Sequence, residues 1–80
     1  MNVTAYVYPS AKGPFWIVLR KTGRWHVLWE VEDLGSYHSP QAAVNDLAGG
    51  HTHWPTCGDP SQFGFPSELA DWEPVERAVR

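Results

Sequence analysis

The most regular pattern along the chain is a pair of apolar runs, residues 15–20 and 25–31, which are rich in β-branched and aromatic side chains. The dipeptide Thr22-Gly23 stands between them, and a short Gly-containing connection of this kind is typical of a β-hairpin. We predict a hairpin over residues 15–31 with Thr22-Gly23 as its two-residue loop. In this register Arg20 lies opposite Trp25 and Val18 lies opposite Val27. Because strand side chains alternate between faces, the register defines two apolar faces. One would carry Trp16, Val18, Arg20, Trp25, Val27 and Trp29, and the other Phe15, Ile17, Leu19, His26 and Leu28.

Two further segments have strand character. Residues 3–8 alternate in character and are rich in residues that favour strands. Residues 72–79 predict a short edge strand, because Pro74 is tolerated only where its missing N–H faces solvent. The segment from Glu32 to Gly35 is interpreted as the end of the third strand or as a short turn. We therefore expect an antiparallel sheet of three to four strands.

One helix is expected over residues 40–48. Ser39 can serve as its N-cap, Pro40 suits the first helical position, and Gly49-Gly50 provides a stop signal. A helix of this length spans about 14 Å, so it can cover one face of the sheet and not both. The side chains expected to face the sheet are Ala43, Val44 and Leu47.

From Gly49 to Pro66 the chain is rich in Gly, Pro, Ser and Thr, which predicts a long loop packed by its own aromatic side chains. A single helical turn is expected at residues 66–70. These segments predict an α+β fold in a single domain, residues 1–80. A small antiparallel sheet would carry one short helix on one face, and a long Gly/Pro-rich loop would follow the helix.

Two segments that follow the tryptophan-bearing hairpin, LGSYHSPQAAVNDLAGGHTHWP and FGFPSELADWE, resemble a group of short bacterial and phage-associated proteins with an AAxxDxAGGHT segment. The resemblance covers roughly Pro14 to Val75. It implies a small intact domain and supplies no catalytic residues. In size and charge the chain also resembles phage-encoded inhibitors of host defence, such as anti-CRISPR proteins. That likeness implies an inhibitor of a host nucleic-acid-handling complex.

Length and composition narrow the function classes. Eighty residues leave no room for a catalytic domain beside a regulatory one, and they offer little volume for a substrate pocket, so we expect no enzymatic activity. The single cysteine, Cys57, excludes an internal disulfide and favours a reducing compartment. The sequence has no signal-peptide pattern and no apolar run that could span a membrane. We therefore expect a cytoplasmic protein without membrane contact.

The charge balance disfavours nucleic acid as the main partner. Six basic residues against nine acidic ones give a net charge of −3, whereas phosphate binding depends on clustered cations. Arg20, Lys21 and Arg24 nevertheless gather at the predicted hairpin tip beside Trp25. A weak nucleic-acid-binding module that uses this tip therefore remains an alternative.

A second alternative is a small zinc-binding domain. His51, His53 and Cys57 are natural zinc ligands and lie within seven residues of one another. Structural zinc sites usually show four recognisable ligands, and this spacing lacks a C-x2-C pair. The competing interpretation makes His51 a cap of the preceding helix and Cys57 a small hydrophobic residue. We therefore expect no metal and no other cofactor.

The favoured hypothesis rests on surplus apolar surface. Two apolar sheet faces and one short helix leave surface that the loop, a second subunit or a partner must cover. Tryptophan is favoured in binding hot spots, and neighbouring acidic residues would steer a basic partner. We therefore predict a non-enzymatic binding protein that blocks or modulates a protein partner with a basic surface, and the pattern is also compatible with a homodimer. The predicted contact residues are Trp16, Trp25, Trp29, Glu30, Glu32 and Asp33.

Overall fold

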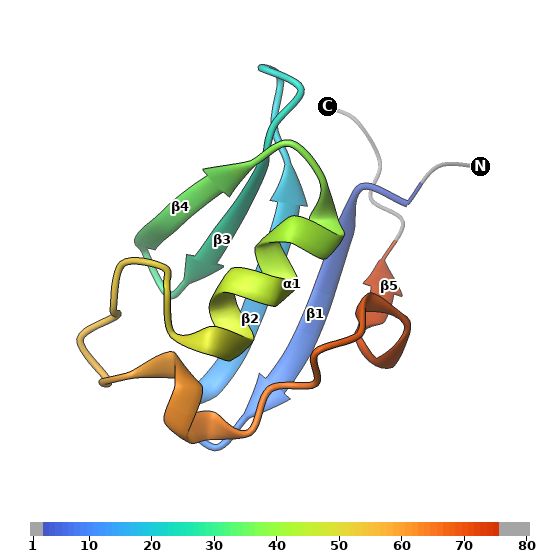
Figure 1. Ribbon diagram of the computed structural model, residues 1–80. Coiled ribbons are helices and arrows are strands. Elements are labelled where there is room, and N and C mark those ends of the chain that lie inside the picture. The colour runs from blue at the N-terminus through green and yellow to red at the C-terminus, as the bar shows by residue number, and fades with distance from the viewer. Residues whose placement is uncertain (1–2, 76–80) are drawn as a thin grey trace.

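The computed structural model describes residues 3–75, which form a five-stranded antiparallel sheet and one α-helix (Figure 1). The first four strands follow one another as a meander, and the fifth returns to pair with the first, in the spatial order β4-β3-β2-β1-β5. The predicted α+β class is confirmed. The strands are β1 (Ala5–Ser10), β2 (Gly13–Leu19), β3 (Trp25–Trp29), β4 (Glu32–Tyr37) and β5 (Glu73–Val75).

The central hairpin forms, but its predicted register is wrong by one residue. Ile17 lies opposite Val27, where the sequence analysis paired Val18 with Val27. The connection is one residue longer than expected, because the Gly23 N–H donates to the Arg20 carbonyl at 3.0 Å and Gly23 adopts a φ of +83°. A turn followed by a left-handed glycine is the usual three-residue hairpin loop. A slip of one residue moves a whole strand's side chains to the other face.

β4 is a full strand, where the sequence analysis had expected only a strand end or a turn. A register shift opposite Val27 and Leu28 leaves Leu34 as an extra residue, so that Val27 pairs with Gly35 and Leu28 pairs with Asp33. This is a β-bulge, which re-aims side chains on the longer strand. As a result Leu34 is buried in the core.

The helix α1 (Pro40–Gly49) begins and ends where the sequence predicted, within one residue. The Ser39 hydroxyl accepts a hydrogen bond from the Ala42 N–H at 3.1 Å, and Gly50 ends the helix with a φ of +76°. These are the N-cap and the left-handed stop that the sequence indicated. The predicted inner side chains are all buried, namely Ala43, Val44 and Leu47.

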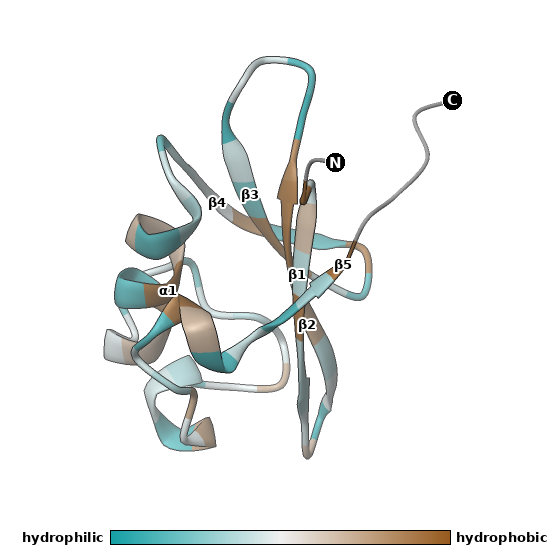
Figure 2. Cartoon of the chain, turned by 90° about the vertical axis from the view of Figure 1, so that its right-hand side faces the viewer, coloured by the Kyte–Doolittle hydropathy of each residue, from teal (hydrophilic) through white to brown (hydrophobic). Residues whose placement is uncertain are grey.

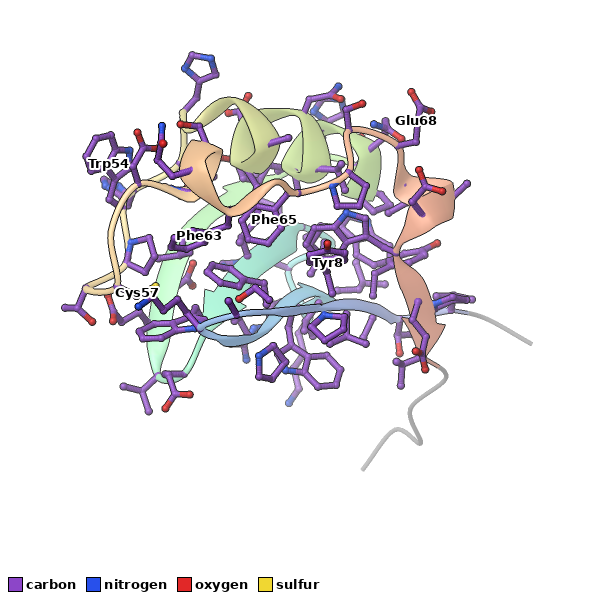
Figure 3. All side chains as sticks on the ribbon, turned by 90° about the horizontal axis from the view of Figure 1, so that it is seen from below. Tyr8, Trp54, Cys57, Phe63, Phe65 and Glu68 are labelled. Carbon is purple, nitrogen blue, oxygen red and sulfur yellow. The ribbon has the colours of Figure 1, made fainter. Side chains whose placement is uncertain are left out.

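The helix and the following loop form one layer on one face of the sheet (Figure 2). Phe63 and Phe65 reach from the loop toward Phe15 of β2, with ring centroids 5.9 and 4.7 Å from the Phe15 ring. Figure 3 shows Phe63, Phe65 and Tyr8 between this layer and the sheet. Trp72 is 2% exposed and packs against Tyr8 and Phe65. The loop aromatics therefore complete the core, although Trp54 is 60% exposed.

Two 3-10 helices interrupt the segment after the helix: η1 (Pro60–Phe63) and η2 (Leu69–Asp71). The second overlaps the helical turn expected at residues 66–70, and the first was not predicted. The edge strand expected over residues 72–79 is confirmed for Glu73–Val75, and the rest of that prediction lies outside the described residues. In the part of the chain that the structure describes, no helix is long and apolar enough to cross a membrane.

Candidate functional site

The sheet face that points away from the helix is the main candidate for a binding surface. Among residues 3–75, no element covers it (Figure 2). Strand pairing places Val7 opposite Trp16, Trp16 opposite Leu28, and Val18 opposite His26. All of these side chains are half-buried. We call this surface the open face; its central residues are Val7, Trp16, Val18, His26 and Leu28.

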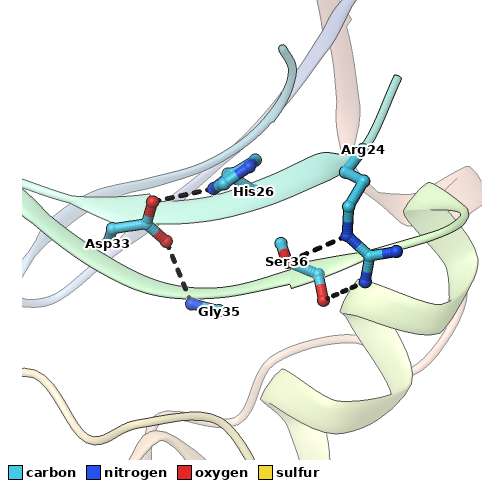
Figure 4. Close-up of polar contacts among 5 residues, drawn as sticks. All are labelled: Arg24, His26, Asp33, Gly35 and Ser36. Carbon is cyan, nitrogen blue, oxygen red and sulfur yellow. Dashed lines mark hydrogen bonds and ion pairs between the residues drawn. The ribbon is translucent and has the colours of Figure 1, made fainter. Parts of the chain in front are cut away.

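Polar contacts fix one side of the open face (Figure 4). His26 Nδ1 lies 2.7 Å from the Asp33 Oδ2 atom, and the other oxygen of Asp33 accepts from the Gly35 N–H at 3.1 Å. The Arg24 guanidinium donates to the Ser36 hydroxyl and the Ser36 carbonyl, at 3.0 and 2.9 Å. These bonds join β3 to β4 and orient the side chains that border the apolar centre. The rim is therefore ordered before any partner binds.

The three predicted contact tryptophans do not share a face. Trp16 is on the open face, whereas Trp25 and Trp29 are on the helix side and pack against the core. Trp25 lies 5.9 Å from Tyr6, measured between ring centroids. The Trp29 indole N–H donates to the Lys12 carbonyl at 3.0 Å, and its ring contacts Phe15. The cause is the hairpin register, which the sequence analysis misassigned by one residue.

The three predicted acidic residues are divided as well. Asp33 lies on the open face beside His26, and Glu32 points to the helix side, where its carboxylate accepts from the Thr56 hydroxyl at 2.7 Å. Glu30 is exposed in the two-residue turn between β3 and β4, with a positive φ of 55°. Only Asp33 of this set belongs to the open face. Glu32 instead holds the long loop against the sheet.

The alternative metal ligands are not gathered. In the stretch from residue 3 to residue 75, no three His, Cys, Asp or Glu side chains are arranged to hold a metal ion. His51 and His53 are exposed, and their backbone N–H groups bond to the Asp46 and Leu34 carbonyls. Burial raises the pKa of the Cys57 thiol, and the nearby Glu32 carboxylate raises this pKa further. Cys57 is therefore a poor nucleophile at neutral pH.

The hairpin tip keeps its cations exposed, as the nucleic-acid alternative requires. Arg20, Lys21 and Arg24 are all solvent-exposed. The predicted pairing of Arg20 with Trp25 is wrong, because Leu19 lies opposite Trp25. The Arg20 backbone instead bonds to the Arg24 carbonyl at 2.9 Å. The tip is therefore cationic, but Arg20 and Trp25 do not form a cross-strand pair.

Among the described residues, both edges of the sheet carry features that disfavour pairing with a further strand, so the open face is the broad surface available for association. At the β4 edge, the His53 N–H donates to the Leu34 carbonyl at 3.0 Å, and the bulge interrupts the strand. At the other edge, the described part of β5, Glu73–Val75, includes Pro74, which lacks an N–H. Short, bulged or proline-containing edges prevent pairing with a further strand.

Comparison of the chain with protein families, curated proteins and solved structures found no match. The case for function therefore rests on the geometry of the chain itself. The sequence predicts surplus apolar surface and places Val18 on the same face as Trp16, but the predicted register assigns His26 and Leu28 to the other face and gives no face for Val7. Side chains alternate between the two faces along each strand. Which strand faces belong together can be assigned only when the length of the hairpin loop is known.

Proposed function

We propose that this protein is a non-enzymatic binding module that engages a protein partner through the open face. The observation that carries this proposal is the apolar centre of the face, built around Trp16 and uncovered among the described residues. An ordered apolar face with a tryptophan at its centre and polar groups at its border has the composition of an interaction hot spot. Occupancy of the partner's surface would be the mechanism.

Charge supports a partner with basic groups. Asp33 lies on the β4 side of the open face, and Glu73 lies opposite Val7 on the β5 side. Two exposed cations, Arg20 and Arg24, stand at the hairpin-tip end of the sheet, and the Arg24 guanidinium already donates to Ser36. The chain as a whole carries a net charge of −3. Acidic groups on both sides of an apolar centre favour a partner surface that is apolar in the middle and basic at its rim.

The narrower role is a blocker of a host nucleic-acid-handling complex in the cytoplasm. A surface that grips nucleic acid is basic, so an acidic module that covers it would exclude the usual ligand by occupancy. The single, free cysteine fits a reducing compartment. This role is a special case of the open-face proposal, and it requires that the open face binds the partner.

The test compares two tryptophan variants that differ only in location. Trp16→Ala removes the centre of the open face, and Trp54→Ala removes an exposed tryptophan from the loop on the helix side (Figure 3). Immobilised wild-type protein is used to retain candidate partners, which are identified, purified and titrated by calorimetry. We expect Trp16→Ala to weaken binding at least about tenfold, while Trp54→Ala binds as the wild type does.

Three results would overturn the proposal. One is equal binding by Trp16→Ala and the wild type. Another is binding to a purified acidic protein that does not weaken as salt is added. The third is a wild-type dimer in sedimentation equilibrium that Trp16→Ala dissociates, because a second copy of the chain would then occupy the open face. Unchanged melting temperatures of both variants show that the comparison reports on the surface and not on the fold.

A further inference from the structure

A second surface feature lies on the helix side of the sheet, at the edge where β1, β5 and η2 meet. It is an apolar groove of about 420 Å³, lined by Val3, Tyr6, Leu69, Ala70, Trp72 and Pro74. This volume is within the range of sites that accept a large side chain or a small ligand. Because Tyr6 pairs with Ile17 and Pro74, the groove and the open face are on opposite sides of the sheet. A ligand in the groove would therefore leave the open face uncovered.

The wall of the groove is held in place by the helix. Gln41 of α1 accepts a hydrogen bond from the Leu69 N–H at 3.0 Å and donates to the Ser67 carbonyl at 3.0 Å. The Trp72 indole lies over Tyr8 and Phe65 in the core, which fixes the groove floor. A preformed concavity binds with a smaller loss of conformational entropy than a flexible one.

The described charged residues beside the groove are acidic. Glu68 and Asp71 flank the lining residues of η2, and both are exposed. Among residues 3–75 the only ion pair joins His26 to Asp33, so no described cation pairs with these carboxylates. Moreover, no Lys or Arg occurs anywhere between residues 25 and 75. Several like charges around one concavity raise the local concentration of cations.

We infer that the groove is a second binding site, which takes a leucine-sized or aromatic side chain from a positively charged peptide segment of a partner. The apolar side chain would enter between Tyr6 and Leu69, and flanking Lys or Arg residues would lie near Glu68 and Asp71. The apolar floor selects against purely ionic ligands, and the carboxylates select against acidic ones. Both features are needed to define the ligand class.

The test uses acetylated, amidated tetrapeptides as probes and two-dimensional NMR of the full-length protein as the readout. Lys-Leu-Leu-Lys carries both recognition features, Lys-Gly-Gly-Lys only the charge, and Glu-Leu-Leu-Glu only the apolar part. We expect Lys-Leu-Leu-Lys alone to shift the resonances of Tyr6, Leu69, Ala70 and the Trp72 indole. Binding by either of the other peptides at equal strength would overturn the inference. Shifts centred on Val7, Val18 and Leu28 would overturn it as well, because they would place the peptide on the open face.

Variants of the protein then distinguish specific binding in the groove from attraction of the cationic peptide by the protein's net charge. Ala70→Trp fills the groove from an exposed position and should abolish the peptide shifts. Asp71→Asn combined with Glu68→Gln should weaken binding about threefold to tenfold, which is the range expected for two rim ion pairs. Glu30→Gln removes one charge at the distant β3–β4 turn and serves as the control, with binding unchanged. Equal weakening per charge removed by Glu30→Gln and by the double variant would show that net charge alone matters, and would overturn the site.

The chain's own basic residues provide one more control. Arg77 and Arg80 follow β5 in the sequence. A variant with Arg77→Gln and Arg80→Gln should bind the cationic peptide as tightly as the wild type does. Binding that is markedly tighter in this variant would show that the chain itself competes for the groove, and it would overturn the assignment to an external partner.

Discussion

Ile17 of β2 lies directly opposite Val27 of β3, and both side chains are completely buried under the helix. This pairing fixes the direction of every other side chain in the hairpin, because neighbours along a strand point to opposite faces. Trp16 therefore points to the open face, while Trp29 points to the core side. Two tryptophans in one hairpin thus have separate roles, one available for binding and one for packing.

The first prediction is a graded loss of stability across the tryptophans. Trp72→Ala should destabilise the fold by about 3 to 5 kcal/mol, since it empties a buried site. Trp29→Ala should cost about 2 kcal/mol, because it removes the contact with Phe15 and the bond to the Lys12 carbonyl. Trp16→Ala should cost about 1 kcal/mol or less. Urea unfolding of the three variants measures the loss in the free energy of unfolding for each. If Trp16→Ala lost as much as Trp72→Ala, the predicted order would be contradicted.

The second prediction concerns alkaline pH. Burial raises the pKa of Tyr37 to about 12, with the nearby Asp46 carboxylate and a hydrogen bond to it as further causes. The phenol ionises near pH 10 when the chain is unfolded. A raised pKa in the folded state means that the neutral phenol contributes stability fully below pH 10, and that this contribution is lost as the pH rises from about 10 to about 12.

The Tyr37→Phe variant tests this assignment, because it keeps the ring and removes the ionisable group. The free energy of unfolding is measured for wild type and variant at a series of pH values. The difference between the two should shrink between about pH 10 and pH 12, since the lysines titrate equally in both proteins. A constant difference across that range would show that Tyr37 does not cause the alkaline loss of stability.

The third prediction compares two glycine substitutions. At Gly23 an alanine would cost stability through backbone strain alone, and at Gly35 it would also clash with a neighbouring side chain. Gly23 has a φ of +83° and no atom near its missing Cβ, so Gly23→Ala should cost only about 1 kcal/mol. Gly35 has a φ of +147°, and a Cβ there would lie 3.1 Å from the Tyr37 hydroxyl oxygen. Gly35→Ala should therefore cost about 3 kcal/mol. Thermal unfolding compares the two, and equal losses would show that Tyr37 moves aside without penalty.

The hairpin and the helix illustrate what the sequence could and could not predict. The Ser39 cap and the Gly50 stop are local signals that act within a few residues, so the helix boundaries were predicted within one residue. The hairpin register depends on whether Gly23 is the second or the third loop residue, and both choices leave apolar side chains on each face. Alternation alone therefore could not decide between them. The bulge at Leu34 and the groove beside Tyr6 arise from tertiary contacts and have no local signature.

The last prediction concerns the bond between Glu32 and Thr56, which ties the long loop to β4. The Glu32 carboxylate accepts from the Thr56 hydroxyl at 2.7 Å and from its backbone N–H at 3.2 and 3.3 Å. Thr56→Val removes only the hydroxyl donor, and Glu32→Gln weakens the bonds from both the hydroxyl and the backbone N–H of Thr56. In a double-mutant cycle the coupling should be about 1 kcal/mol, typical of a hydrogen bond to a charged group that is partly exposed.

Cys57 reports on the same bond, because it is next to Thr56 in the chain and the Glu32 carboxylate raises its pKa. Glu32→Gln removes that charge and loosens the loop, so the thiol should be alkylated faster than in the wild type at a given pH near neutrality. Thr56→Val loosens the loop but keeps the charge, so its increase should be smaller. If both variants reacted at the same increased rate, loop opening alone would control access to Cys57. The carboxylate would then have no separate effect on the thiol, contrary to this prediction.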